Sequence, residues 1–309
     1  MKRDFTKLLD ITQKECDHLL KRAKRIKELR HKGKPYQPLA GKALAMIFEK
    51  ASTRTRLSFE TGMHELGGHA IFLSPSETQI GRGEPIQDTA RVMSRYVHGI
   101  MIRTFSQAIV DDLARWATIP VINGLSDELH PCQILSDLFT IQEYKGSLGN
   151  VKVAYIGDGN NVANSWIEAA ILVKMPLAIA APKGYEPDSE LVRQASGVPG
   201  FTLTDDPCEA VRDADVIYTD VWVSMGQEKE KASRKKAFKG YKIDDTLLKA
   251  AHRDAIVMHC LPAYRGQEIT EEVFERFSDV IFTQAENRLH VQKALLEWLI
   301  KGPATALAE

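Results

Sequence analysis

The fold is decided by residues 43–73, which read ALAMIFEKASTRTRLSFETGMHELGGHAIFL. The apolar run 43–48 has the length and composition of a buried strand. Ser52 is a favoured N-cap residue, and the segment after it predicts a helix that ends at the glycine pair 67–68. A second apolar run follows at 70–73. A strand, a helix and a strand in this order predict a parallel sheet covered by helices.

The same alternation occurs on both sides of the glycine-rich segment 146–150. Before it, a long helix should begin at His130-Pro131 and run to Lys145. After it, we expect strands at 151–156, 177–181, 215–219 and 255–259 and a last helix at about 285–301. The sequence therefore predicts an α/β fold with two domains, each a parallel β-sheet flanked by helices. The predicted bounds are 1–146, with the C-terminal helix at about 285–309 packing back on them, and 147–284.

Two other segments carry separate predictions. Residues 5–32 have apolar positions at helical spacing and are followed by Gly33, which predicts an N-terminal helix. Residues 227–242 are charged, rich in lysine and poor in core residues, which predicts a mobile surface loop.

Size and charge limit the class of protein. The chain has 309 residues, more than one hydrophobic core usually serves, so two domains are expected. It is 44% hydrophobic and 27% charged, as in ordinary globular proteins. The formal net charge is +0, so no global field favours nucleic acid or an anionic membrane as a partner.

The cysteines and the chain's apolar runs point to a cytoplasmic protein. The four cysteines include no Cys-x-x-Cys pair, so neither a disulfide framework nor a zinc ribbon is expected. No apolar run approaches the roughly 18 residues that a membrane span needs. The first ten residues lack the apolar region of a signal peptide.

The helix that begins after Ser52 has two arginines in its first turn. Positive side chains are unfavourable there, because the N-terminal end of a helix already carries partial positive charge. A bound anion removes this objection. The free N–H groups, the hydroxyls of Ser52, Thr53 and Thr55, and the guanidinium of Arg54 or Arg56 together suit a phosphate group. A basic helix face without a ligand is the alternative.

The second half contains a rival motif. Gly157-Asp158-Gly159 follows a predicted strand and resembles the start of a dinucleotide-binding fingerprint, but Val162 stands where the third glycine should fall. A dehydrogenase is therefore disfavoured. Asn160 and Asn161 instead place amide groups at the carboxyl end of a strand, where open α/β sheets bind ligands. A purely structural turn is the alternative.

Five blocks of the chain resemble ornithine carbamoyltransferases. They occur in the family's order and span about 48–290. They are Ser52-Thr53-Arg54-Thr55-Arg56, Arg103 in Met101-Ile102-Arg103-Thr104, His130-Pro131-Cys132-Gln133, Asp220 with Ser224-Met225-Gly226, and His259-Cys260-Leu261-Pro262. The phosphate block and the His-Pro-x-Gln block are similar to carbamoyltransferases in general. The last two blocks are similar to the ornithine branch.

The resemblance implies a site for carbamoyl phosphate. The matching positions are Ser52, Thr53, Arg54, Thr55, Gln79, Arg103, His130, Gln133, Cys260, Leu261 and Arg288. Residues 52–55 would hold the phosphate, and Gln79 would reach the site of a neighbouring subunit. Arg103, His130 and the Thr55 hydroxyl would donate hydrogen bonds to the carbonyl oxygen as it becomes an oxyanion.

The resemblance also implies a site for ornithine. The matching positions are Asn161, Asp220, Ser224 and Met225. Asp220 would pair with the α-amine, while Asn161 and the Met225 N–H would meet the carboxylate. The δ-amine must lose a proton before it attacks, because a free alkylamine has a pKa of about 10.4. Asp220 and Cys260 are the candidates for managing that proton, and the sequence leaves the choice between them open. The implied catalytic residues are thus Arg103, His130, Asp220 and Cys260.

The implied reaction is a direct transfer that gives citrulline and phosphate, as in arginine biosynthesis. It has no redox step, so no organic cofactor is expected. His259-Cys260 alone makes a poor zinc site, so no metal is expected. The active site should lie in the cleft between the domains, with the 224–242 segment closing over ornithine. Family resemblance further implies a homotrimer or a multiple of trimers.

Other acceptors and another class of protein are the alternatives. An aspartate carbamoyltransferase would carry Arg-x-Gln-x-Glu and Pro-Leu-Pro-Arg blocks where this chain has Ser224-Met225-Gly226 and His259-Cys260-Leu261-Pro262. A putrescine enzyme would not need an amino-acid-head site, and an N-acetylornithine enzyme is chemically close. A non-catalytic binding protein on the same fold would have lost Arg103, His130 or Cys260, and all three are present.

Overall fold

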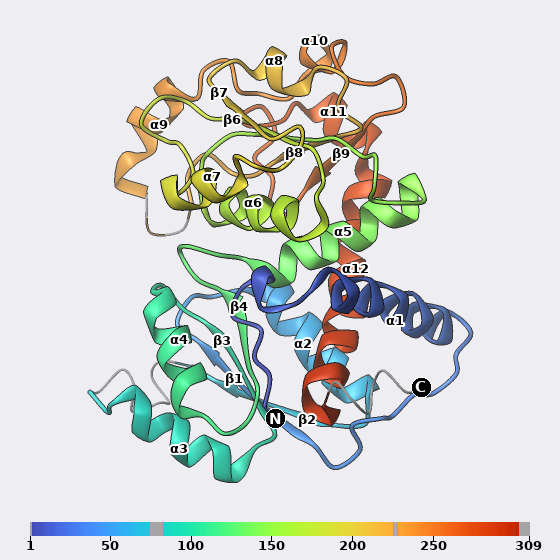
Figure 1. Ribbon diagram of the computed structural model, residues 1–309, viewed down its shortest axis with the longest axis vertical. Helices are drawn as coiled ribbons and strands as arrows, with labels where there is room; N and C mark the ends of the chain where they lie inside the picture. Colours follow the sequence, from blue (N-terminus) through green and yellow to red (C-terminus); the bar gives the residue numbers. More distant parts are fainter. Residues whose placement is uncertain (1, 75–82, 225, 227, 303–309) are drawn as a thin grey trace. The chain divides into compact units, whose positions relative to one another are not determined.

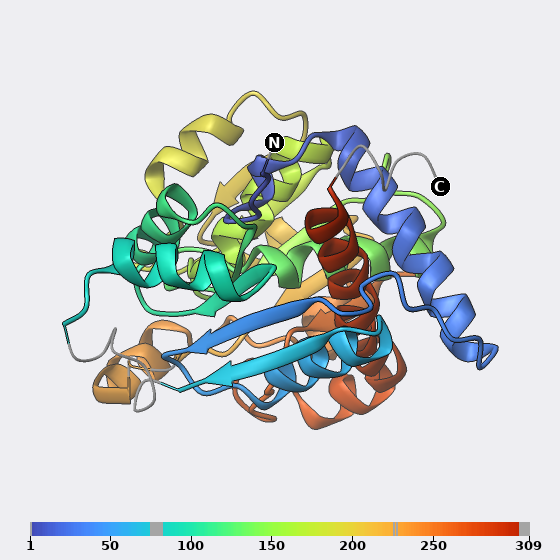
Figure 2. The same ribbon diagram turned by 90° about the horizontal axis from the view of Figure 1, so that it is seen from below.

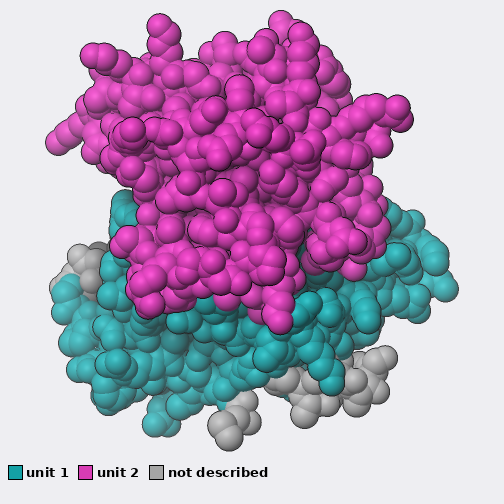
Figure 3. Space-filling model, turned by 45° about the horizontal axis from the view of Figure 1, so that its top comes forward, with its two compact units in different colours: residues 1–139, 287–309 teal, residues 140–286 magenta. Residues whose placement is uncertain are grey.

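The computed structural model describes residues 2–74, 83–224, 226 and 228–302. The chain divides into two compact units, unit 1 with residues 1–139 and 287–309 and unit 2 with residues 140–286 (Figure 3). The division falls within two helices, α5 (Pro131–Lys145) and α12 (Ser278–Lys301). Each unit has one parallel sheet flanked by helices (Figure 1), so the predicted α/β fold with two parallel sheets is confirmed.

The sheet of unit 1 has four parallel strands in the order β2-β1-β3-β4. The strands are β1 (Ala43–Phe48), β2 (His69–Leu73), β3 (Gly99–Arg103) and β4 (Val121–Leu125). Figure 2 shows β1 and β2 side by side. The other elements are η1 (Leu8–Asp10), α1 (Gln13–His31), α2 (Thr53–Glu65), α3 (Ile86–Tyr96) and α4 (Gln107–Trp116).

Helices cover both faces of this sheet. On one face, apolar residues of α3 and α4 such as Ala90 and Leu113 pack against Ile47 and Ile102 of the strands. On the other side of the sheet, α2 packs against α12 (Figure 1). Gly62 permits this approach, because a Cβ there would lie 3.2 Å from Cγ of Lys293. The central strands are thus buried on both sides, as their unbroken apolar runs predict.

The N-terminal helix is shorter than predicted. It begins at Gln13 rather than at residue 5, because Thr12 caps it and forms a capping box with Glu15. The preceding segment is extended and adds to the edge of the sheet. Its Phe5 N–H donates to the Val121 carbonyl, and the Asn123 N–H donates to the Phe5 carbonyl, each over 2.8 Å.

The sheet of unit 2 has five parallel strands in the order β7-β6-β5-β8-β9. They are β5 (Val153–Ile156), β6 (Leu177–Ala180), β7 (Thr202–Thr204), β8 (Val216–Thr219) and β9 (Ile256–His259). The other elements are α6 (Asn161–Val173), α7 (Ser189–Ala195), α8 (Pro207–Val211), η3 (Glu228–Glu230), α9 (Lys231–Ala237), α10 (Asp245–Leu248) and α11 (Glu271–Arg276).

Alternate residues of the central strands of unit 2 belong to different cores. Ala154 and Ile217 join the apolar cluster that includes residues of α8, α10 and α11. The neighbouring residues Tyr155 and Tyr218 stack on each other, and Trp166 of α6 meets Tyr218 edge to face with ring centroids 5.2 Å apart. This alternation holds the sheet between two layers of helices.

The predicted elements of unit 2 agree with the structure except in three places. The strand β7 was not predicted, because Thr202–Thr204 is short and largely exposed. The last helix, α12, begins at Ser278 rather than near 285. The prediction of a loop over 227–242 was wrong, because η3 and α9 lie within it; Gln227 is outside the described residues. The side chain of Arg234 is buried and anchors α9.

Within the part of the chain that the structure describes, we find no helix with both the length and the apolar character to cross a membrane.

Candidate active site

The predicted phosphate-site residues of unit 1 follow the carboxyl ends of its strands. Arg103 is the last residue of β3, Ser52 follows β1, and His130 follows β4 and directly precedes α5. Phe48 pairs with Arg103 in the register of β1 and β3. Because the carboxyl ends of parallel strands share one edge of a sheet, these polar groups gather there.

The start of α2 is arranged around Thr55. The Ser52 hydroxyl caps the helix and accepts a hydrogen bond from the Thr55 N–H over 3.2 Å. The Thr55 side chain is buried, and its Oγ1 accepts a hydrogen bond from Nη2 of Arg288 over 2.7 Å. Thr53 and Arg54, in the same first turn, are exposed. The start of α2 therefore combines free backbone N–H groups with the positive charges of Arg54 and Arg288. This arrangement suits a bound anion.

Arg56 has partners within its own unit. Its Nε donates to Oε1 of Glu60 over 2.9 Å, and its guanidinium lies 3.7 Å from the centre of the Phe72 ring. Among the described residues, Arg56 is thus paired with Glu60 and Phe72, and the unfavourable positive charge in the first turn of α2 is that of Arg54.

His130 is buried among positive groups. Burial, together with the positive charges of Arg288 and Arg103, lowers the pKa of His130 well below 6.5. The imidazole is therefore neutral at pH 7 and has one N–H to donate. Arg103 and Arg288 are buried as well. The two guanidinium groups therefore bring positive charge next to a neutral imidazole donor, a combination that suits a phosphate-containing ligand.

This lowered pKa predicts a loss of stability in acid. Below about pH 6.5 the unfolded chain protonates His130 while the folded chain does not, so stability falls as pH falls, by up to about 1.4 kcal/mol per pH unit. His130→Asn should flatten this part of the curve, measured by urea unfolding between pH 5 and 8. His64→Asn, which changes an exposed histidine of α2, should leave the slope as in the unmodified chain. Equal slopes for His130→Asn and the unmodified chain would refute the assignment.

The next residues of α5 have different roles. Cys132 is buried and donates from Sγ to the Asn123 carbonyl, and burial raises the pKa of its thiol to about 12, so it is a poor nucleophile. Gln133 is also buried, and its Nε2 donates to Oδ1 of Asp137 over 2.9 Å. Gln133 thus lies in the first turn of α5, three residues after His130.

In unit 2, Asp220 and Cys260 meet at the carboxyl edge of the sheet, after β8 and β9 respectively. Sγ of Cys260 donates to Oδ1 of Asp220 over 2.9 Å, and Nδ2 of Asn160 donates to Oδ2 over 2.9 Å. The buried carboxylate therefore has a donor on each oxygen. The sequence predicted Asp220 and Cys260 as site residues and placed the Asn160 amide at the ligand-binding end of a strand, but it did not assign Asn160 to the ornithine site; Asn160 also caps α6 through its Oδ1. The signal was its position after β5, beside Asn161.

A buried histidine holds the segment after Cys260. The Leu261 N–H donates to Nδ1 of His259 over 2.9 Å, so the ring proton is on Nε2, which lies 3.1 Å from Oε1 of Glu268. Leu261 has φ +59°, a left-handed conformation that costs energy for a non-glycine residue. The hydrogen bond to His259 offsets part of that cost. His259 and Glu268 were not predicted as site residues, and no local pattern links them.

Asp220, His259 and Cys260 also bear on the question of a metal. Each offers a potential ligand atom, and these atoms lie within 4.8 Å of one another, so the structure adds Asp220 to the pair considered from sequence. However, both ring nitrogens of His259 are hydrogen-bonded, and the Cys260 thiol donates to Asp220. The potential ligand atoms are therefore engaged in two separate sets of hydrogen bonds, Cys260 with Asp220 and His259 with Leu261 and Glu268.

The remaining predicted ornithine residues are only partly described. Asn161 is the first residue of α6, directly after Asn160, and Ser224 is half-buried, four residues after Asp220. Met225 and Gln79 lie outside the described residues.

Arg234 and Asp158 form a buried ion pair in unit 2. Nη1 of Arg234 donates to Oδ2 of Asp158 over 2.8 Å and to the Trp222 carbonyl over 3.2 Å. Its guanidinium also lies 4.9 Å from the centre of the Tyr185 ring. Burial raises the pKa of Asp158 to about 6, although the Arg234 charge acts to lower it. Arg234 therefore connects α9 to the end of β5 and to the segment that leads to Ser224.

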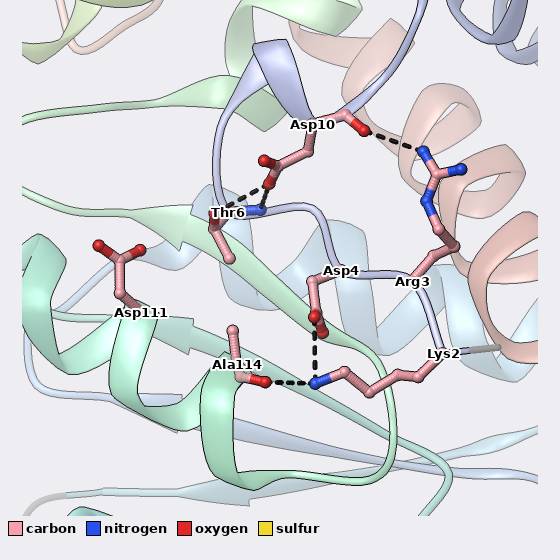
Figure 4. Close-up of a pocket in the computed structure, with 7 residues that line it drawn as sticks. All are labelled: Lys2, Arg3, Asp4, Thr6, Asp10, Asp111 and Ala114. Atoms are coloured by element: carbon pink, nitrogen blue, oxygen red, sulfur yellow. Dashed lines mark hydrogen bonds and ion pairs between the residues drawn. The ribbon is translucent and has the colours of Figure 1, made fainter.

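A hollow of about 340 Å³ in unit 1 is a separate feature (Figure 4). Figure 4 shows the Lys2 ammonium between the Asp4 carboxylate and the Ala114 carbonyl. Oδ2 of Asp10 accepts hydrogen bonds from the N–H and the hydroxyl of Thr6. None of the predicted site residues lines it, and its charges are largely paired internally, so it is not a candidate for the active site.

Two family models match the chain. Residues 3–143 match the carbamoyl-P binding domain of aspartate/ornithine carbamoyltransferase, and residues 149–299 match the Asp/Orn binding domain of the same family. Together the two matches cover most of the chain.

Curated proteins and solved structures agree with this match. The chain is 55% identical to the ornithine carbamoyltransferase of Methanoculleus marisnigri over 98% of each chain. It is 56% identical to that of Syntrophus aciditrophicus over 97% of this chain and 100% of the relative. Among solved structures, the ornithine carbamoyltransferase from Pyrococcus furiosus is 50% identical, with a TM-score of 0.92 over 97% of this chain and 98% of that one. The anabolic enzyme from Campylobacter jejuni is 46% identical, with a TM-score of 0.90 over 96% and 98%.

Proposed function

The chain belongs to the aspartate/ornithine carbamoyltransferase family, and we propose that it transfers the carbamoyl group of carbamoyl phosphate to the δ-amine of L-ornithine. The products are L-citrulline and inorganic phosphate. The observation that carries the proposal is the Cys260–Asp220 hydrogen bond at the carboxyl edge of the unit 2 sheet. It places an anion and a thiol together, where a cationic amine can bind and lose its proton.

Unit 1 binds carbamoyl phosphate in this proposal. The first turn of α2, from Ser52 to Thr55, holds the phosphate, with Arg288 fixed beside it through Thr55. Arg103 and neutral His130 donate to the carbonyl oxygen, and the lowered pKa of His130 supports its role as a neutral donor. Gln79 and Gln133 are the other unit 1 residues in the proposed carbamoyl phosphate site. Cys260 and Leu261 of unit 2 belong to the same proposed site.

Unit 2 binds ornithine in this proposal. The Asp220 carboxylate pairs with the α-amine, and the ornithine carboxylate is met by Asn161, Ser224 and the Met225 N–H. Asn160 fixes the orientation of Asp220. Cys260 lies against the δ-amine, within one hydrogen bond of Asp220.

The reaction balances without a cofactor. The δ-ammonium first loses a proton, either directly to Asp220 or to Cys260 once the Cys260 thiol has passed its own proton to Asp220. The lone pair of the amine then forms the new C–N bond, and the carbonyl oxygen takes the negative charge in a tetrahedral species. The oxyanion then re-forms the carbonyl while the C–O bond breaks and its electron pair leaves with the phosphate, which takes the second proton from the nitrogen. Holding both substrates together offsets roughly 7–11 kcal/mol of the barrier.

The wider setting belongs to the same proposal. The domain that binds carbamoyl phosphate is residues 1–146 with the C-terminal helix at about 285–309, and the domain that binds ornithine is residues 147–284. The enzyme is a homotrimer or a multiple of trimers in the cytoplasm, where it serves arginine biosynthesis. Gel filtration with light scattering tests the assembly, and a monomer would contradict it.

A single assay tests the activity. Purified protein is incubated with carbamoyl phosphate and ornithine, aspartate, putrescine or N-acetylornithine, and carbamoylated product is measured with each. We expect product with ornithine at a kcat/KM at least about 100-fold above the others, because a buried polar site rejects acceptors that leave its groups unpaired. Absence of citrulline would refute the proposed function.

A further inference from the structure

The side-chain amide of Gln133 is bonded at one end only. Gln133 is 1% exposed, and its Nε2 donates to Oδ1 of Asp137 over 2.9 Å. Its carbonyl oxygen, Oε1, is also buried, and among the residues that the structure describes nothing donates a hydrogen bond to it. A buried carbonyl oxygen without a donor is rare in folded proteins, so we expect this oxygen to accept a hydrogen bond from a bound ligand.

A second glutamine in the same unit shows what a structural version of this pair looks like. Gln107 and Asp111 have the same spacing on α4, and Nε2 of Gln107 donates to Oδ1 of Asp111 over 3.0 Å. There, however, Oε1 accepts hydrogen bonds from Nδ2 of Asn123 over 3.0 Å and from Oγ of Ser126 over 2.7 Å. Within the described ranges, both ends of the Gln107 amide have partners, whereas only the nitrogen end of the Gln133 amide does.

Asp137 determines which way the Gln133 amide points. Oδ1 of Asp137 accepts from the NH₂ end of the amide, so the amide carbonyl oxygen is turned the other way. Asp137 is completely buried and lies one turn after Gln133 on α5. Rotation of the amide would set its oxygen against the carboxylate, so the observed orientation is strongly favoured.

The oxygen is held near the groups assigned to carbamoyl phosphate. Gln133 and Asp137 are spaced i and i+4, so their side chains share one side of α5, and the Gln133 N–H donates to the carbonyl of His130, which directly precedes the helix. Burial and the positive charges of Arg288 and Arg103 in turn lower the pKa of His130. Those two arginines offer only donors, whereas Gln133 offers an acceptor. A ligand that satisfies all of them must accept on one atom and donate from another.

We propose that Asp137 is a positioning residue for substrate specificity: it fixes Gln133 so that Oε1 accepts a hydrogen bond from the NH₂ of the transferred group. This inference rests on the proposed function, since carbamoyl phosphate supplies that NH₂. An acyl phosphate of the same shape with a methyl group, such as acetyl phosphate, leaves Oε1 buried and unpaired. The pair therefore selects carbamoyl over acyl phosphates, as a site built for a donor rejects the analogue that lacks it.

Asp137→Asn tests the inference, because an amide can face either end of Gln133 and no longer fixes its orientation. The KM for carbamoyl phosphate is measured at saturating ornithine, and acetyl phosphate is titrated as a competitive inhibitor. We expect the KM to rise about 10- to 100-fold while the inhibition constant of acetyl phosphate changes less than about threefold. A purely structural role would weaken both ligands alike and leave their ratio unchanged.

Two further variants complete the test. Gln133→Met combined with Asp137→Leu removes both members of the pair and replaces them with apolar side chains of similar size, so it gives a second, independent variant that should show the same loss of preference. Asp111→Asn changes the matched pair on α4 and should keep the unmodified preference. An unchanged ratio in both the double variant and Asp137→Asn overturns the inference. Absence of citrulline with the unmodified protein would instead overturn the proposed function, so the two failures are distinguishable.

Discussion

Replacing Arg103 with methionine is expected to lower kcat about 100- to 1000-fold, the usual effect of losing one donor to a developing oxyanion. Arg103 is buried at the end of β3, beside the carboxyl ends of β1 and β4. Methionine keeps much of the side-chain volume but cannot donate. The effect should be larger on kcat than on the KM for ornithine, because the donor acts on the carbonyl oxygen. Steady-state rates of citrulline formation measure both constants.

Two controls make this test specific. Arg115→Met removes an arginine of the same unit whose side chain is 73% exposed, and it should leave kcat unchanged. Arg103→Lys keeps the positive charge but loses the planar fork, so it should recover only part of the rate. A kcat for Arg103→Met within tenfold of the unmodified enzyme would remove Arg103 from the proposed mechanism.

The central strands could be predicted because each is a run of consecutive apolar residues, as expected for a strand that is buried on both faces. Every residue of Ala43–Phe48 is apolar, so both faces of the strand can be buried, and this run forms β1, an inner strand of its sheet. The strands β5 and β9 were predicted from similar apolar runs. The strand β7 carries no such signal, since its Thr202–Thr204 lies at an edge and is largely exposed. Its pairing with β6 depends on the neighbouring strand, not on its own composition.

The helix boundaries depended on whether a cap was recognised. The cap at Ser52 placed the start of α2 correctly. The N-terminal helix was started too early, although Thr12 and Glu15 have the spacing of a capping box. The apolar periodicity extends to residues before the Thr12 cap because Phe5 and Leu8 are also buried. However, Phe5 pairs with the edge of the sheet and Leu8 lies in η1.

The polar residues that support the site were the hardest to predict. Asn160 and Asp220 are 60 residues apart in the chain, and nothing local to either residue shows that they pair. The Gln133–Asp137 pair is local, at helical spacing, but its meaning depends on the unbonded oxygen at the other end of the amide. Sequence similarity supplied the groups that are expected to touch substrate. The contacts that orient those groups required coordinates.

The segment 227–242 was predicted as a mobile loop because of its lysines, and the structure instead places a buried arginine in it. Arg234→Met should lower the free energy of unfolding of unit 2 by about 3–5 kcal/mol, because Asp158 would remain buried without its partner. The KM for ornithine should rise as well, since Arg234 also holds the Trp222 carbonyl, two residues before Ser224. Urea unfolding and steady-state kinetics measure the two effects.

The pH dependence of this loss identifies its cause. The pKa of Asp158 is raised to about 6 in the folded chain from 3.8, so protonation favours the folded state, and the penalty of the buried carboxylate develops as pH rises from about 4 to 6. Without Arg234 the carboxylate is harder still to ionise, so Arg234→Met should be much less destabilising at pH 5 than at pH 7.5.

Adding Asp158→Asn to Arg234→Met should recover part of the stability at pH 7.5. Arg276→Met, which breaks an exposed ion pair with Asp245, should cause little change at either pH. A loss that is equal at both pH values would mean that packing of the Arg234 side chain, and not its charge, holds α9 in place.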